Sequence, residues 1–488
     1  IKGITVKKSE NFSEWFTQVV QKAELADIRY GVAGFIVHLP YAMRITRKIY
    51  ELLEEELEKD DHEPMLMPIA TLEENLQKEA EHAGFTPEVF WITQAGSEKL
   101  ERKLALRPTG ETQIYPMYSL WIRSYNDLPY KRYQSRITVF RNEMNTRPFL
   151  RGREFMFFES HDVFANHEDV MKQIHTDMEI MDKVVRKNLF IPFIFFKRPQ
   201  WDKFKGADDT YASDTLNPDG RRNQISSTHD LGTNFAKAFD VTFIDEAGQK
   251  QYAFQTCFGP GIWRITAALI AIHGDDNGLV LPFALAPVQI IVIPITFSNK
   301  EEQNTKLKNL GKELTNKLKG FGFRVKSDNR ELTPGEKYNI WELKGVPLRI
   351  ELGPKELESK TATMVYRTNR SKFKISIEDE NLKEIIIDHG KKIDNDIKKQ
   401  AELYFKGNTK TASTLDEVKI ILKNHRGFVT APFCSINSDG EECATKLKEE
   451  TSAYVCGVPL KEKKLKTKKN CIICEKPTNL MVHIALSI

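Results

Sequence analysis

Apolar positions recur at helical spacing in several long segments of the chain. Ile45 and Ile49 lie on one side of the segment 40–59, and Pro40 fits the first turn of a helix, where proline is tolerated. The same spacing predicts further helices over 167–189, 263–273 and 300–319. Arg264 therefore falls in the first turn of an apolar helix.

Shorter apolar runs bounded by turn residues predict strands. The runs 136–140 and 154–158 flank a polar loop, which is typical of an antiparallel hairpin, and 63–69 is expected to be a short strand. Hairpins and helices without regular alternation predict an α+β domain on an antiparallel sheet over residues 1–285. Alternating strands and helices predict a small α/β domain over 286–395, and the segment 396–488 is expected to be a small C-terminal α/β domain.

Composition narrows the class of protein. The 488 residues correspond to about three domains. A 40% hydrophobic and 29% charged composition excludes a disordered chain, and a net charge of +4 excludes a uniformly basic nucleic-acid coat. The apolar run 279–297 contains Pro282, Pro287 and Pro294, which predicts a linker and a buried strand instead of a membrane span. Five of the six cysteines follow position 430, which indicates a metal site in a reducing compartment; we expect a cytoplasmic protein without membrane association.

Charged and aromatic residues gather around the predicted hairpin. Arg141 and Glu143 project together from one strand, as do Arg153, Phe155 and Glu159 from the other. Such a face could bind a nucleotide: arginine would pair with phosphate, phenylalanine would stack on the base, and a carboxylate would accept a hydrogen bond from an exocyclic amine. A ladder of surface salt bridges fits the same pattern.

Two further stretches favour a substrate site. The turn RPTGET at 107–112 offers Thr109 and Glu111 to a cationic amine, although alone it could be an ordinary turn. Arg264 follows a Gly-Pro-Gly turn at a helix start, where its charge and the helix dipole would both attract phosphate.

Together these stretches resemble a class II aminoacyl-tRNA synthetase, most closely prolyl-tRNA synthetase of the eukaryotic and archaeal type. Residues 40–68 match motif 1, FRNE at 140–143 with Arg151 and Phe155 matches motif 2, and Arg264 before AALIAIHGD matches motif 3. RPTGET, RPFLRGREF at 147–155, HGDDNGLVLP at 273–282 and WELKGVPLRIELGP at 341–354 mark the prolyl subgroup.

The resemblance implies activation of L-proline with ATP, transfer to tRNA(Pro), and a homodimer formed through motif 1. Arg141 and Arg264 are the expected catalytic residues. The ATP-binding residues implied are Arg141, Glu143, Arg151, Gly152, Arg153, Phe155, Gln224, Ser227 and Arg264, and Mg²⁺ is expected with ATP. The proline-binding residues implied are Thr109, Glu111, Arg141, Phe157, Glu159, His161, His229 and Cys257.

The resemblance also implies functions for the middle and C-terminal domains. The α/β domain resembles an anticodon-binding domain, with Arg330, Glu342, Lys344 and Arg349 as base-reading candidates and Arg367 as a further one. Cys434, Cys443, Cys471 and Cys474 resemble the family's C-terminal structural zinc site, and Cys471 and Cys474 have knuckle spacing. HIALSI, the final residues, lack the tyrosine of many relatives, so no active-site role is expected for them.

Two other functions remain open from the sequence. The chain could be a tRNA-binding paralogue without catalysis, although the set of arginines and Glu143 disfavours this. It could also be a class II synthetase for another small amino acid, which RPTGET and WELKGVP disfavour.

Overall fold

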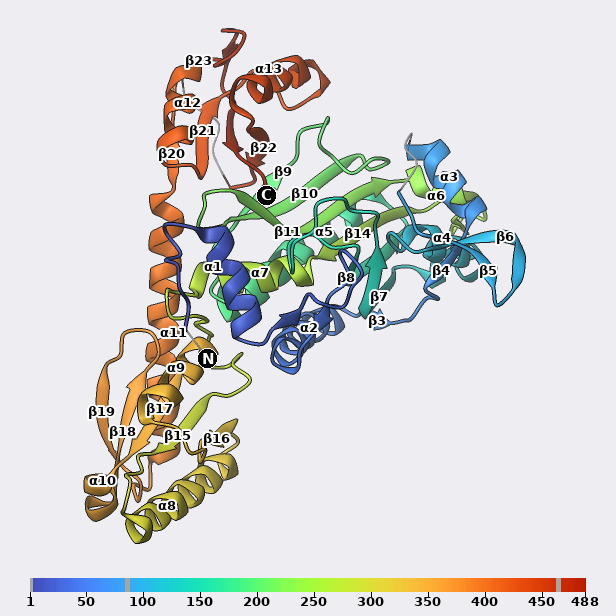
Figure 1. Cartoon of the computed structure of the whole chain (residues 1–488). Helices are drawn as coiled ribbons and strands as arrows, with labels where there is room; N and C mark the ends of the chain where they lie inside the picture. Colours follow the sequence, from blue (N-terminus) through green and yellow to red (C-terminus); the bar gives the residue numbers. More distant parts are fainter. Residues whose placement is uncertain (1–2, 84–87, 462–466) are drawn as a thin grey trace.

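The computed structural model describes residues 3–83, 88–461 and 467–488 of the chain (Figure 1). Across the described residues, an eleven-stranded sheet runs through the N-terminal and C-terminal regions. Its strands, in spatial order, are β20 (Thr409–Thr411), β21 (Phe428–Pro432), β25 (Met481–Ala485), β22 (Tyr454–Pro459), β9 (Ile194–Lys197), β10 (Asp209–Leu216), β11 (Arg222–Gly232), β14 (Phe254–Pro260), β8 (Glu154–Phe164), β7 (Tyr130–Phe140) and β3 (Glu63–Pro64). The pairs from β21 to β7 are antiparallel, as predicted for the N-terminal region.

The predicted hairpin is formed by β7 and β8, which are both longer than expected. Their register pairs Phe140 with Glu154 and Val139 with Phe155. The loop 141–153 therefore begins and ends at one end of the sheet and carries Arg141, Glu143 and Arg151 together. The strand expected over 63–69 is shorter, because β3 ends at Pro64. Met65 N–H still donates to the Tyr133 carbonyl of β7, but Met67 N–H donates to the Gln134 side chain instead of to the backbone of a strand.

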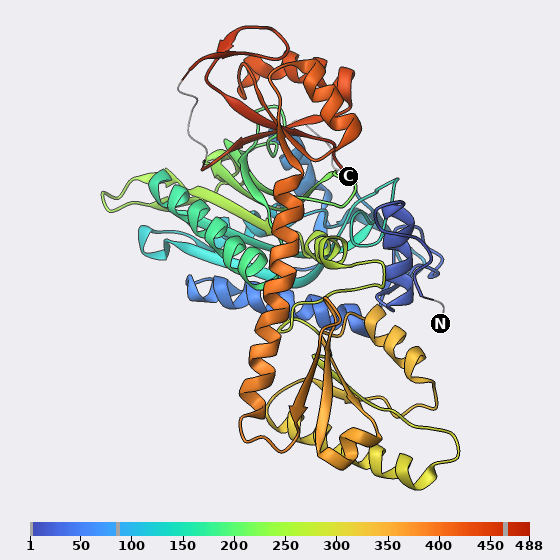
Figure 2. The ribbon, with the colours of Figure 1, turned by 90° about the vertical axis from the view of Figure 1, so that its left-hand side faces the viewer.

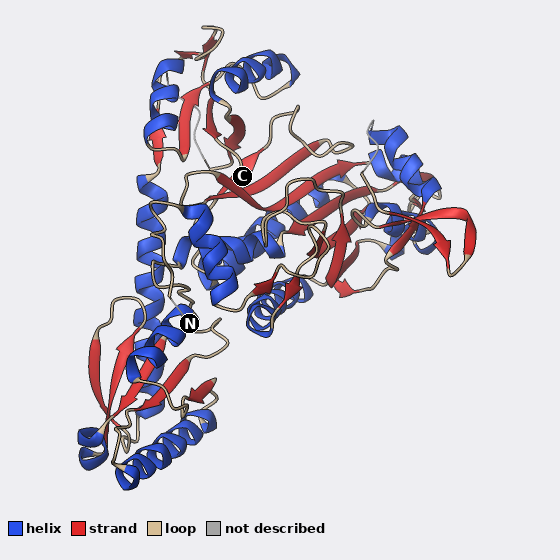
Figure 3. Cartoon of the chain, viewed as in Figure 1, coloured by secondary structure: helices blue, strands red, loops and turns tan. Residues whose placement is uncertain are grey.

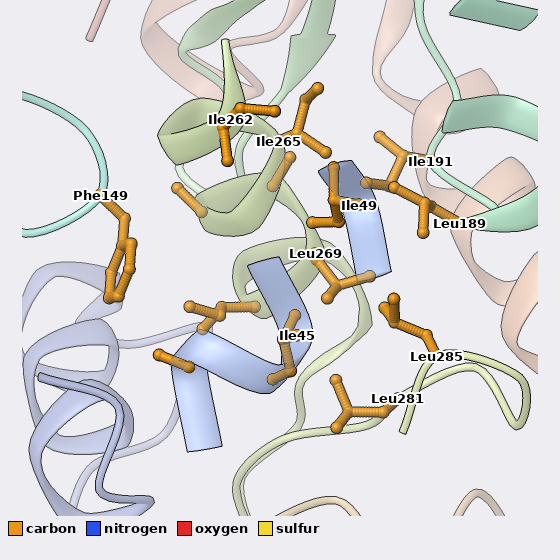
Figure 4. Packing of buried hydrophobic residues seen from close by; sticks show 14 of the residues in the cluster. Ile45, Ile49, Phe149, Leu189, Ile191, Ile262, Ile265, Leu269, Leu281 and Leu285 are labelled. Atoms are coloured by element: carbon orange, nitrogen blue, oxygen red, sulfur yellow. The ribbon is translucent and has the colours of Figure 1, made fainter. Parts of the chain in front are cut away.

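Two amphipathic helices form the centre of the largest hydrophobic core. Apolar side chains of α2 (Pro40–Lys59) and α7 (Ile262–His273) meet there, and Figure 4 shows Ile45 and Ile49 of α2 near Leu269 of α7. Helix α7 also packs against β8 and β11, which fixes Arg264 beside the sheet. The helix expected over 167–189 consists of α5 (His167–Met181) followed by a π-helical segment, Asp182–Asn188.

Smaller elements surround this core, as Figure 3 shows. A three-stranded sheet has the order β4 (Ala70–Leu72), β6 (Glu98–Leu106) and β5 (Trp91–Ala95). Two short pairs are β1 (Ala26–Asp27) with β2 (Val37–His38) and β12 (Thr242–Ile244) with β13 (Lys250–Tyr252). The further helices are α1 (Phe12–Lys22), α3 (Glu73–Ala83), α4 (Glu111–Trp121), a 3-10 turn (Tyr125–Asp127) and α6 (Asn234–Phe239).

The middle region has the predicted α/β character. Its sheet has the order β16 (Val325–Ser327), β15 (Ile290–Pro294), β17 (Leu348–Leu352), β18 (Thr361–Tyr366) and β19 (Lys372–Ser376). β15 is parallel to both of its neighbours, β16 and β17, whereas β18 is antiparallel to both β17 and β19. Its helices are α8 (Glu301–Gly320), α9 (Pro334–Leu343), α10 (Pro354–Ser359) and α11 (Leu382–Gly407).

Helix α11 connects the middle region to the C-terminal region along one side of the N-terminal region (Figure 2). The boundary predicted between residues 395 and 396 falls inside this helix. The C-terminal region adds α12 (Leu415–Asn424), a 3-10 turn (Ser438–Gly440), α13 (Glu441–Thr451), β23 (Lys469–Asn470) and β24 (Pro477–Thr478). Among the helices that the structure describes, none combines the length and apolarity needed to cross a membrane.

Candidate active site

A cavity of about 890 Å³ opens where the loop 141–153 meets β8, β11, β14 and the start of α7. This volume lies within the usual range for small-molecule sites. The residues predicted for the site that line it are Thr109, Glu111, Arg141, Glu143, Arg151, Gly152, Phe155, Phe157, Gln224, Ser227, His229, Cys257 and Arg264. Segments that are up to about 150 residues apart in the sequence thus meet around one space.

Positive charge is concentrated on one side of this cavity. Burial, followed by the neighbouring charges of Arg151 and Arg141, lowers the pKa of Arg264 to about 10. The Arg264 Nε donates to the Leu150 carbonyl at 3.3 Å, which holds the guanidinium beside the loop. Because like charges that repel one another are stabilised by an anion between them, this side of the cavity suits a polyphosphate.

An aromatic surface adjoins the arginines. The Phe155 ring lies 6.2 Å from Trp263, and Phe157 meets Phe155 edge-on at 6.3 Å between centroids. Gly152 faces Trp263 so closely that a Cβ there would lie 2.5 Å from the indole ring. Glycine is therefore needed for the loop to pack against Trp263, and Glu143 and Phe155 border the space where a base could stack.

The other side of the cavity is lined by hydrogen-bonding groups. The Thr109 hydroxyl donates to the Glu111 carboxylate, and the Cys257 thiol lies 3.5 Å from the same carboxylate. Burial, followed by the charges of Glu111 and Glu159, raises the pKa of Cys257 well above its ordinary value. Cys257 is thus a neutral thiol, and the Glu111 carboxylate is left to accept from a cationic amine.

Glu159 and His161 lie behind this surface instead of lining the cavity, and both are fully buried. The Glu159 carboxylate accepts from the Gly110 N–H at 3.2 Å, from Gln134 Nε2 at 2.6 Å and from His161 Nε2 at 2.8 Å. Burial lowers the pKa of His161, but the charge and hydrogen bond of Glu159 together with the charges of Glu111 and Asp162 outweigh burial, and the pKa is raised. Both residues therefore position the turn that carries Thr109 and Glu111.

His229 and Gln224 reach the cavity from β11. His229 Nδ1 and the Thr210 hydroxyl share a hydrogen bond of 2.9 Å, and burial lowers the pKa of His229 to about 3, so its ring is neutral. The Gln224 amide oxygen accepts from Arg198 at 2.8 Å.

Some residues lie at other positions relative to the cavity than the sequence predicts. Arg153 is not among the residues that line the cavity, because its Nε donates to the Glu143 carbonyl at 3.1 Å and its guanidinium faces Phe90. Asp202 and Phe204, in the loop after β9, line the cavity without any motif in the sequence to indicate it. The chain end also differs: Arg151 donates to the Ile488 carbonyl oxygen at 2.9 Å, so the final residues reach the rim of the site.

The four cysteines of the expected zinc site lie together. Their Sγ atoms all lie within 4.8 Å of one another, whereas Cys456 is not part of this group. Four thiolates at about 2.3 Å from one zinc ion form a tetrahedron with sulfurs about 3.8 Å apart, so the donor set fits the metal.

The residues predicted to read bases contact two different regions of the structure. Arg349 pairs with Glu342 at 3.0 Å and lies 3.9 Å over the Tyr338 ring, while Arg330 pairs with Asp328. Lys344 instead contacts the N-terminal region, where it pairs with Glu24 and lies over Tyr41.

Arg367 is also turned away from solvent, and its side chain is 3% exposed. It donates to both carboxylate oxygens of Asp275 at 2.6 and 2.7 Å and therefore joins the middle region to the N-terminal region. An arginine held in this way makes a structural contact between the two regions, and its role in reading bases stays a prediction.

Comparison with known proteins identifies the family. Family profiles match at residues 90–273 (tRNA synthetase class II core domain (G, H, P, S and T)), 289–386 (anticodon binding domain) and 415–487 (prolyl-tRNA synthetase, C-terminal). The proline–tRNA ligase of Thermofilum pendens is 52% identical, over 99% of both chains, and that of Thermococcus kodakarensis is 40% identical over 98% of both. The chain belongs to the prolyl-tRNA synthetase family.

Solved structures of prolyl-tRNA synthetases have the same fold. The prolyl-tRNA synthetase of Giardia lamblia in complex with prolyl-adenylate is 34% identical, covers 99% of this chain and 100% of its own, and gives a TM-score of 0.95. That of Cryptosporidium parvum with halofuginone and AMPPNP is 33% identical, covers 100% of this chain and 97% of its own, and gives 0.92. The predicted fold class, a class II catalytic sheet followed by anticodon-binding and C-terminal domains, is confirmed.

Proposed function

We propose that the 890 Å³ cavity is the adenylation site at which this chain activates L-proline with ATP. As a prolyl-tRNA synthetase, the chain forms prolyl-adenylate and transfers the prolyl group to the 3′ end of tRNA(Pro). One observation carries the location of the site: Arg141, Arg151 and Arg264 converge beside the Thr109–Glu111 turn in a single space.

The arginines account for the chemistry of activation. The proline carboxylate attacks the α-phosphorus and displaces diphosphate, so charge develops on phosphate oxygens, and fixed cations stabilise it more than water does. Arg141 holds the α-phosphate and the carboxylate in line, and Arg151 and Arg264 hold the outer phosphates. Mg²⁺ that enters with ATP would neutralise further phosphate charge. No general base is required, because the attacking carboxylate is already ionised.

The remaining lining residues recognise the two substrates. Phe155 stacks on adenine, Glu143 accepts from its amino group, and Gln224 and Ser227 bind the ribose side. Thr109 and Glu111 hold the proline imino group, since a buried carboxylate attracts a secondary ammonium. Phe157, neutral His229 and protonated Cys257 shape the pyrrolidine pocket.

The other regions serve tRNA binding and assembly. The Arg330, Glu342 and Arg349 side chains are proposed to read the anticodon, and Lys344 remains a weaker candidate because of its contact with Glu24. The exposed side chains of Leu66 and Ile69, just after α2, support a homodimer formed through motif 1. The four C-terminal cysteines would hold a structural zinc ion that joins β21, α13 and the segment before β24.

Amino-acid-dependent exchange of diphosphate into ATP, measured with all twenty amino acids, tests this function. We expect exchange with proline, and aminoacylation of tRNA(Pro) by the same preparation. Exchange driven by a different amino acid would instead indicate another class II specificity, and tRNA binding without exchange would indicate a non-catalytic paralogue.

A further inference from the structure

A fully buried arginine lies directly behind the proposed ATP site. Arg198 follows β9, and its side chain is 2% exposed. It donates to both Asp214 carboxylate oxygens at 2.6 and 2.7 Å, to the Gln224 amide oxygen at 2.8 Å and to the Cys456 carbonyl at 2.7 Å. No motif in the sequence marks this residue, and it does not line the cavity.

These contacts determine which way the Gln224 amide points. A guanidinium has five donors and no acceptor, so only the amide oxygen of Gln224 can face Arg198. The Gln224 NH₂ group is then left for the cavity that Gln224 lines. Without Arg198, the amide could rotate and present its oxygen to the ligand, where it would repel phosphate oxygens and could no longer donate to an acceptor.

The arginine itself is held from two sides. Asp214 on β10 forms a two-pronged pair with it, which fixes the plane of the guanidinium. Cys456 lies at an irregularity in the pairing of β22 with β25, between Val455 and Gly457, and its carbonyl accepts from Arg198. Gly457 permits this approach, because a Cβ there would lie 2.1 Å from the Lys197 carbonyl oxygen.

We propose that Arg198 is a positioning residue for adenylation, which orients the Gln224 amide toward ATP while Asp214 and the Cys456 carbonyl hold the guanidinium in place. The proposal rests on the proposed function of the cavity. It makes the position of β22 from the C-terminal region important for the ATP site, although none of the described residues of that region lines the cavity.

Steady-state diphosphate exchange with Arg198→Lys, Gln224→Leu and the double variant tests the proposal in the full chain. Lysine keeps the charge next to Asp214 but cannot make four directed hydrogen bonds at once. We expect the KM for ATP to rise about tenfold in each single variant while the KM for proline stays within about twofold. In the double variant the loss should be no larger than that of Gln224→Leu alone, because Arg198 acts through Gln224.

Arg186→Lys is the matched control. Arg186 also joins a carboxylate, Asp182 at 2.6 Å, to a backbone carbonyl, that of Phe193 at 2.7 Å, but it contacts no residue of the cavity. Its KM for ATP should be unchanged. If Arg198 had a purely structural role, Arg198→Lys would lower the thermal unfolding temperature and kcat but would change the KM for ATP and the KM for proline to the same extent. The effects of Arg198→Lys and Gln224→Leu would then multiply in the double variant. Either result would overturn the proposal.

Gln224→Glu gives an independent test if Arg198→Lys does not fold. The carboxylate keeps the contact with Arg198 but loses the N–H donors. We expect a thermal unfolding temperature at or above that of the wild type together with an increase of at least about tenfold in the KM for ATP. An unchanged KM for ATP in Gln224→Glu would contradict the role of Arg198, but proline-dependent exchange by the wild type would still support the proposed function. If the wild type shows no proline-dependent exchange, both the proposed function and the role of Arg198 are overturned.

Discussion

Replacing Gly110 by alanine tests whether the buried Glu159 carboxylate, behind the proposed proline pocket, positions the turn that carries Thr109 and Glu111. A Cβ at residue 110 would lie 2.3 Å from Glu159 Oε1 and 2.7 Å from its Cδ, whereas ordinary contact begins at 3.4 Å. The carboxylate must therefore retreat by about 1 Å, which stretches its hydrogen bonds to Gly110, Gln134 and His161.

The size of the effect follows from those hydrogen bonds. A hydrogen bond to a charged group contributes about 1.5–3 kcal/mol, so weakening three of them should lower the free energy of unfolding by about 2–4 kcal/mol. Gly110 directly precedes Glu111, so the same shift displaces the proposed imino-group ligand. A loss of about 1.4 kcal/mol in substrate binding is tenfold, and we expect the KM for proline to rise at least about tenfold.

Diphosphate exchange at varied proline and varied ATP, with calorimetric unfolding of the same samples, measures both quantities. The KM for ATP should change much less than that for proline. Gly335→Ala is the control, because Gly335 also lies at a helix start but a Cβ there meets nothing within 4 Å. A KM for proline and an unfolding temperature that both match the wild type in Gly110→Ala would refute the positioning role of Glu159.

Three further outcomes are expected. Arg141→Ala should slow proline-dependent exchange by far more than about tenfold, or about 1.4 kcal/mol, and a smaller loss would contradict its role at the α-phosphate. Purified protein should contain about one zinc ion by atomic absorption, and Cys471→Ser should reduce the zinc content and the unfolding temperature; wild type with little zinc would argue against the site. Burial and the Asp162 charge raise the pKa of Asp177 from 3.8 to about 7, so the folded state binds more protons than the unfolded state between these values. The contribution of Asp177 to the free energy of unfolding should therefore fall as pH rises from about 4 to about 7. Between these values, stability measured by urea unfolding should change with pH less favourably in the wild type than in Asp177→Asn, and an equal slope in both proteins would exclude a contribution from Asp177.

The sequence predicted regular elements well where one face is polar. Helix α2 was predicted with the bounds that the structure has, because its apolar stripe is clear and Pro40 marks its first turn. Strand β8 was predicted too short. Its second half, Glu159 to Asp162, is polar in the sequence yet almost fully buried. Glu159 accepts from Gln134 and from His161 of the same strand, and Asp162 accepts from His62, so hydrogen bonds offset part of the cost of burial. Alternation of polar and apolar residues cannot reveal a strand that is covered on both sides.

The candidate site was predictable only as far as its motifs extend. Arg141, Glu111 and Arg264 lie in stretches that the family resemblance identifies, and the cavity contains all three. The resemblance did not separate residues that line the cavity from those behind it, such as His161. Phe204 and Arg198 were missed because their roles depend on contacts between segments far apart in the chain, which composition and spacing do not encode.

The arrangement of β9 explains why the C-terminal region cannot be treated as an appended module. β9 pairs with β10 on one side and with β22 on the other, so the C-terminal region covers what would otherwise be an open sheet edge beside the cavity. The same strand leads into Arg198, whose hydrogen bonds reach both Cys456 and the cavity residue Gln224. A displacement of β22 would therefore change the backbone that precedes Arg198 and remove one of its acceptors at the same time. The side of the cavity next to Gln224 is thus lined by the N-terminal region and supported from behind by β22 of the C-terminal region, and its geometry should depend on the position of β22.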